Sequence, residues 1–229
     1  MARKLYLIPI IHMSADMGAI ALALDKRATA ELGQGLWQKH QEVVSSFWDS
    51  INRFFGSLDV NGFKVYQDGL VANGAEGLGI IREGISQGSK NYQIIGKLLE
   101  RGGVLVRTEN LTLVKQERSH VMKMAASKSP KEREVTALRY KLAQSRLLKQ
   151  RDHFIANRIG ETLGEGETGI LFIGAYHNII PNLPADIKVV RVKEVDKVRE
   201  YHTALINNRR WGRYLQELSE YLVSPVLAR

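Results

Sequence analysis

Two histidines stand at or just after the ends of short apolar runs, where a side chain is well placed to do chemistry. His12 follows the run at residues 5–11, and His177 comes shortly after the run at residues 170–173. Glu109 stands behind a third run of this kind. Neutral imidazole and carboxylate oxygen are ligands of divalent metals, and the same groups transfer protons without a metal. We therefore predict that His12, Glu109 and His177 are catalytic residues and ligands of a divalent ion, Zn²⁺ or Mn²⁺.

Other polar residues lie at the end of a further run at residues 63–66, beside His177, or on a late helix. The residues predicted to bind the substrate are Tyr66, Gln67, Asp68, Arg151 and Asn178. Arg151 offers a guanidinium fork that fits a carboxylate or a phosphate, which favours a small anionic substrate.

Each of these residues also has a purely structural explanation. Asp68 precedes Gly69, and an Asp in such a turn commonly bonds to its own backbone. Glu109 is explained structurally by a helix N-cap region or by a salt bridge to Arg151 or Arg107, and either histidine alone is explained by a structural hydrogen bond. Arg151 and Asp152 belong to a charge-rich stretch that is typical of a solvated helix face.

Apolar runs separated by helical patterns must position these side chains. The runs that predict strands cover residues 5–11, 63–66, 104–106, 169–173 and 187–192. Strands that alternate with helices form parallel sheets with right-handed crossovers, so that their carboxyl ends share one edge, where ligands bind. The sequence therefore predicts an α/β fold with a central, mostly parallel sheet flanked by helices. One domain, 1–229, accounts for the whole length.

Helical periodicity fills the segments between these strands. The predicted helices cover residues 17–32, 37–58, 91–100 and 111–163, with a C-terminal helical segment from 194 to about 222. The helical insertion at about 111–163 is broken near 127–130, where Ser129 is the expected N-cap. The stripe from Trp37 to Phe55 is predicted to be buried against the sheet or a partner subunit, which leaves a homo-oligomer open. Glycines at 74, 77 and 79 predict a loop up to residue 80.

Composition narrows the class of protein further. The chain has no cysteine, which excludes disulfides and thiolate metal sites. No apolar run approaches the roughly 18 residues of a membrane span, and the first run is too short for a secretory signal, so we expect a cytoplasmic protein with no membrane partner. The net charge of +9 is spread among acidic residues and favours a solvated basic surface over a nucleic-acid interface.

Three short motifs occur together in an order that resembles a known superfamily. They are a histidine closing the first strand (His12), a late helix with Arg151, Asp152 and Ala156, and Gly174 three residues before His177. This layout resembles the superfamily that contains TraB and Tiki proteins, ChaN-like haem-uptake proteins and erythromycin esterases. The segment before His12 departs from the family pattern, because it holds neither the glycine nor the acidic residue often found there.

The resemblance implies a pocket that binds metal in some members and serves hydrolysis or haem binding in others. It carries over to His12, Glu109, Arg151 and His177 of this chain. Our leading hypothesis is therefore a hydrolase acting on a small anionic substrate, with a divalent metal that activates water. An alternative is a non-catalytic protein that binds an anionic metabolite or haem in the same pocket. A second alternative is a nucleic-acid or protein interaction module that uses the basic helix at 131–158.

Overall fold

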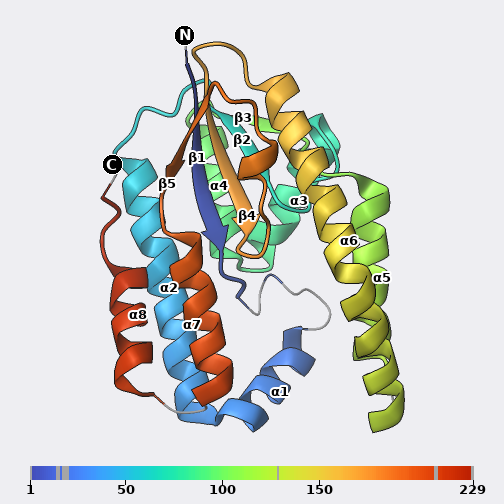
Figure 1. Ribbon diagram of the computed structural model, residues 1–229. Helices are drawn as coiled ribbons and strands as arrows, with labels where there is room; N and C mark the ends of the chain where they lie inside the picture. Colours follow the sequence, from blue (N-terminus) through green and yellow to red (C-terminus); the bar gives the residue numbers. More distant parts are fainter. Residues whose placement is uncertain (1, 14–15, 17–20, 128, 209–210, 228–229) are drawn as a thin grey trace.

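Five parallel strands form the sheet at the centre of the protein (Figure 1). The computed structural model describes residues 2–13, 16, 21–127, 129–208 and 211–227. The strands are β1 (Arg3–Ile10), β2 (Lys64–Gln67), β3 (Val104–Val106), β4 (Thr168–Gly174) and β5 (Ile187–Arg191). They lie in the order β3-β2-β4-β1-β5, and every neighbouring pair is parallel. The predicted α/β fold with a parallel central sheet is confirmed, and all strands end at the same edge.

Helices cover both faces of the sheet. They are α1 (Ala21–Leu32), α2 (Gln34–Gly56), α3 (Gly74–Ser86), α4 (Lys90–Glu100), α5 (Leu111–Ala125), α6 (Pro130–Thr162), α7 (Val195–Asn208) and α8 (Arg213–Val223), with a short 3-10 helix, η2 (Ile180–Asn182). The first part of the helix predicted from residue 17, residues 17–20, lies outside the described residues, and α1 is described from Ala21. Among the described residues, no helix combines the length and the apolar character needed to cross a membrane.

Side chains along each strand point alternately to the two faces of the sheet, and they form an apolar layer on each face. In β4, Ile170 and Phe172 face the layer that contains α2, α4, α7 and α8, while Leu171 and Ile173 face the layer beneath α6. Successive side chains of a strand point to opposite faces, so a strand buried on both sides is apolar throughout. This explains why residues 5–10 of β1 and 169–174 of β4 carry no charged side chain.

Helix α2 anchors one face of the sheet. Its residues Phe47 and Trp48 are fully buried, which confirms the burial predicted for this stripe. The indole N–H of Trp48 donates a hydrogen bond to the carbonyl oxygen of Ile11 over 3.1 Å. This bond fixes the chain just beyond β1, immediately before His12.

Helices α5 and α6 form an antiparallel hairpin that extends beyond the carboxyl ends of the strands (Figure 1). As predicted, the helical stretch is interrupted before Pro130, and the Ser129 hydroxyl oxygen caps α6 by accepting the Glu132 backbone N–H over 3.1 Å. The last turns of α6 pack on the sheet through Ile155 and Ile159. The same helix therefore spans from the core to the space above the strand ends.

The prediction of a glycine-rich loop up to residue 80 is wrong, because α3 begins at Gly74. Two glycines of this helix allow close packing. A Cβ at Gly77 would lie 2.6 Å from the carbonyl oxygen of Ala72, and one at Gly84 would lie 2.4 Å from the ring of Tyr92. These two glycines let α3 approach its neighbours closely. Composition alone does not distinguish glycines with this role from glycines of a loop.

Candidate functional site

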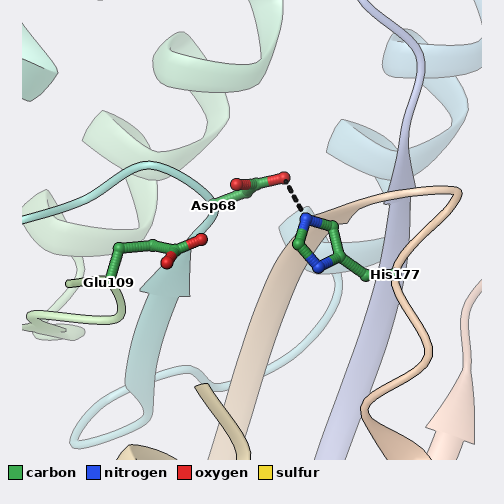
Figure 2. Close-up of side chains that lie close together, drawn as sticks. All are labelled: Asp68, Glu109 and His177. Carbon is green, nitrogen blue, oxygen red and sulfur yellow. Dashed lines mark ion pairs between the residues drawn. The ribbon is translucent and has the colours of Figure 1, made fainter. Parts of the chain in front are cut away.

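Three side chains converge from three consecutive strands of the sheet. Asp68 follows β2, Glu109 follows β3, and His177 lies in the turn after β4, as Figure 2 shows. One ligand atom from each of them lies within 4.8 Å of the other two. The convergence follows from the parallel topology, because neighbouring strands deliver their next polar residues to the same edge.

Asp68 is held by partners on both carboxylate oxygens. Its Oδ2 accepts the Gly174 backbone N–H over 2.9 Å and lies 3.5 Å from Nε2 of His177. Its Oδ1 accepts a hydrogen bond from Nη2 of Arg151 over 2.5 Å. Burial by itself raises the pKa of Asp68, but the hydrogen bond and charge of His177, followed by the charge of Arg151, hold that pKa well below its usual range. Asp68 is therefore an anion.

Gly174 makes this approach possible. A Cβ at this position would lie 3.0 Å from Oδ2 of Asp68 and 3.4 Å from Cδ2 of His177. The carbonyl oxygen of Gly174 also accepts the His177 backbone N–H over 3.0 Å. The glycine three residues before the histidine thus allows both the turn and the contact with Asp68.

His177 is oriented by a carboxylate from α6. Its Nδ1 lies 2.6 Å from Oδ1 of Asp152, whose Oδ2 accepts the backbone N–H of Asn178 over 3.0 Å. Burial lowers the pKa of an imidazole, but the hydrogen bonds to Asp152 and Asp68 outweigh it here and raise the pKa of His177 to about 9. Because Nδ1 faces Asp152, Nε2 is the nitrogen presented to Asp68.

Glu109 is completely buried, and within the described part of the chain only one of its two carboxylate oxygens has hydrogen-bond partners. Its Oε1 accepts hydrogen bonds from Nε of Arg151 over 3.0 Å and from Nη2 of the same residue. Its Oε2 has no hydrogen-bond partner among the described residues. Burial raises the pKa of Glu109 to about 7, against the opposing hydrogen bond from Arg151. An unpaired buried carboxylate oxygen is costly and needs a proton or a cation.

Arg151 holds the acidic groups together. Its guanidinium donates to Asp68 and Glu109 and also to Glu117 of α5. The cluster thus contains four carboxylates, those of Asp68, Glu109, Glu117 and Asp152, around two cationic side chains, Arg151 and His177. The excess of acidic groups fits a site for an additional cation.

A cavity of about 450 Å³ opens beside this cluster. Asp68, Arg151 and His177 line it, together with His12 and Asn91. A cavity of this size is suited to a small molecule.

The structure places His12 on the cavity wall but outside the three-residue group. Its side chain is 56% exposed, and its Nδ1 lies 3.7 Å from Oδ2 of Asp16. Asp68, which the sequence analysis assigned to substrate binding, takes the third position of the group instead.

The remaining predicted substrate residues lie in three different environments. Gln67 lines the cavity, and its amide is bonded to the Asp68 carbonyl and to Asn91. Tyr66 belongs to the apolar layer beneath α6, where its hydroxyl lies 2.9 Å from Oγ1 of Thr162. Asn178 lines a neighbouring groove of about 700 Å³ beside α6.

Sequence reasoning did not select Asp152 or Glu117 as site residues. The charge-rich stretch around Asp152 predicts a solvated helix face, yet both Arg151 and Asp152 are buried. A signal was present, because Arg151 and Asp152 are each four residues before a fully buried residue of α6, Ile155 and Ala156, and therefore share its inner face. Nothing in the sequence singles out Glu117, which α5 brings to Arg151.

Comparisons of the chain with protein-family models, with curated proteins and with solved structures gave no significant match.

Proposed function

We propose that this protein is a metal-dependent hydrolase that binds one divalent cation through Asp68, Glu109 and His177. The observation that carries the proposal is the carboxylate of Glu109, which is fully buried with Oε2 unpartnered among the described residues. It lies beside two further ligand atoms within 4.8 Å. A cation bound there would give that oxygen the partner it lacks.

The donor set supports zinc or manganese. It offers one imidazole nitrogen and carboxylate oxygens, and the chain has no cysteine to add thiolate. Asp152 stands behind His177 in the way that carboxylates stand behind metal-binding histidines, where they fix the ring and raise its basicity. Nε2 of His177 releases its proton when it acts as a ligand.

A divalent cation held by Asp68, Glu109 and His177 would lower the pKa of bound water and would polarise a carbonyl or phosphoryl oxygen. The protein's own residues supply the rest. Arg151 keeps Asp68 and Glu109 oriented, and the adjacent cavity holds the substrate. His12, on the wall of that cavity, is our candidate for proton transfer to the leaving group.

The proposal agrees with the resemblance to the superfamily of TraB and Tiki proteins, ChaN-like proteins and erythromycin esterases, in which some members bind metal. We extend it to a cytoplasmic location, which the absence of cysteine supports because exported proteins often rely on disulfides.

The test is hydrolysis of small chromogenic esters and phosphates by protein stripped of metal with a chelator. We expect no turnover until Zn²⁺ or Mn²⁺ is restored, loss of turnover in Glu109→Gln, and normal turnover in Glu161→Gln, which changes an exposed carboxylate of α6. Equal rates with and without metal would remove the cation from the mechanism. Tight metal binding without turnover of any substrate would favour the non-catalytic binding alternative.

A further inference from the structure

We infer that the cavity binds a protonated amine through Asp16 and Asn91, which both line it, so that the substrate carries an amino group. The inference rests on the proposed function, since it treats this cavity as the substrate site. Its basis is two buried oxygen acceptors without partners among the described residues, and a cavity lining in which the described residues include no free lysine or arginine.

The cavity offers little to an anion, because its cationic side chains are already paired with carboxylates. His177 faces Asp152 with Nδ1 and Asp68 with Nε2. Among the described residues that line it, Arg151 is the one lysine or arginine. Its guanidinium is engaged by Asp68, Glu109 and Glu117. The guanidinium of Arg151 predicts an anionic substrate in the sequence, but in the structure these three carboxylates already take its hydrogen-bond donors. Binding an anion here would require Arg151 to leave buried carboxylates unpaired, which is strongly unfavourable.

Asn91 presents an acceptor, and its orientation follows from its neighbours. Nε2 of Gln67 donates to the Asp68 carbonyl oxygen over 3.1 Å, so Oε1 of Gln67 must face Asn91. Nδ2 of Asn91 donates to that oxygen over 3.0 Å. An amide has one donor side and one acceptor side, so Oδ1 of Asn91 is left as the acceptor. Asn91 is only 2% exposed, lines the cavity, and has no partner for Oδ1 among the described residues.

Asp16, which also lines the cavity, presents a second acceptor. Its side chain is 6% exposed, and Oδ2 accepts the Met13 backbone N–H over 2.7 Å. His12 also faces Oδ2. Oδ1 has no partner within the described part of the chain. A buried carboxylate oxygen in this state favours a ligand that donates a hydrogen bond and carries positive charge.

Three aromatic side chains among the lining residues suit a cation. Tyr92, Tyr140 and Tyr176 line the cavity, and a tyrosine ring face attracts an ammonium group. His202 also lines the cavity, and burial, with a contribution from nearby His12, lowers its pKa to about 4, so that it adds no positive charge at neutral pH. A protonated amine has three donors, enough for both free oxygens, whereas a hydroxyl has one.

The test compares three probes of similar size, benzylammonium, benzyl alcohol and benzoate, by calorimetric titration of the full chain at pH 7. We expect benzylammonium to bind at least about tenfold more tightly than the other two, a difference of about 1.4 kcal/mol. Asp16→Asn should reduce the benzylammonium affinity by at least about tenfold, because it replaces the charge and one acceptor. Asp186→Asn is the matched control, since Asp186 pairs with Arg3 and does not line this cavity.

Asn91→Leu provides an independent second variant if Asp16→Asn does not fold, and it should also weaken benzylammonium binding. Benzoate binding as tightly as benzylammonium, or an unchanged preference in the folded variants, would overturn the inference. Metal content is measured on the same samples. Stoichiometric metal without amine preference refutes the amine site alone, whereas amine preference without metal binding supports the amine site and refutes the proposed metal function.

Discussion

Nδ1 of His177 lies 2.6 Å from Oδ1 of Asp152, which joins the turn after β4 to helix α6. Both side chains are buried, so the contact is shielded from water. It determines which nitrogen of the ring faces Asp68. Asp152 therefore acts as a positioning residue for the proposed metal ligand.

The variant Asp152→Asn tests this role. Without the carboxylate, the imidazole loses the group that fixes its orientation and raises its basicity, and we expect metal affinity to fall roughly 10–100-fold. Titration of metal-stripped protein with Zn²⁺ measures the effect. His153→Ala, at the adjacent exposed position, should bind as the wild type does. An Asp152→Asn variant with wild-type affinity would show that the contact serves only the fold.

Arg151→Ala should destabilise the protein strongly. The change leaves Asp68, Glu109 and Glu117 without their shared cation, and breaking a buried ion pair of this kind costs about 3–5 kcal/mol. Urea denaturation measures the free energy of unfolding. Arg146→Ala, an exposed change on the same helix, should stay within about 0.5 kcal/mol of the wild type. If Arg151→Ala also lowered the free energy of unfolding by no more than about 0.5 kcal/mol, the network would contribute little to stability.

His40 gives the protein a defined sensitivity to acid. The residue is buried, with Nδ1 2.9 Å from the hydroxyl of Tyr201, and burial, with a contribution from His202, lowers its pKa from 6.5 to about 4. The unfolded state binds the proton more readily than the folded state does. Stability is therefore lost as pH falls from 6.5 to about 4, by roughly 3 kcal/mol from this residue.

Denaturation at several pH values checks the His40 contribution. The variant His40→Gln should show a shallower loss of stability between pH 6.5 and 4, while His153→Gln, which changes an exposed histidine, should follow the wild type. Parallel pH profiles for wild type and His40→Gln would rule out this contribution.

The fold was predictable because buried strands consist mostly of apolar residues, which can be recognised in the sequence. Segments of mostly apolar residues predicted all five strands, and the change to polar residues predicted to within about one residue where they end. Helix α3 was missed, because glycines that permit close packing, such as Gly77, resemble glycines of a loop in composition.

The site was predictable in part. Glu109 and His177 follow from the rule that parallel strands end at one edge. The place of His12 depends on strand order, which the sequence does not reveal. The three grouped residues come from the neighbours β3, β2 and β4, whereas His12 follows β1, one strand further along the sheet.

The most direct test of the proposed metal site is the number of metal ions bound per chain. Chelator-stripped protein is dialysed against Zn²⁺ or Mn²⁺ and its metal content is determined by elemental analysis. We expect one ion per chain in the wild type and in His12→Ala, and loss of that ion in Glu109→Gln and His177→Ala. No bound metal in the wild type, or equal loss in His12→Ala and Glu109→Gln, would contradict a metal site formed by Asp68, Glu109 and His177.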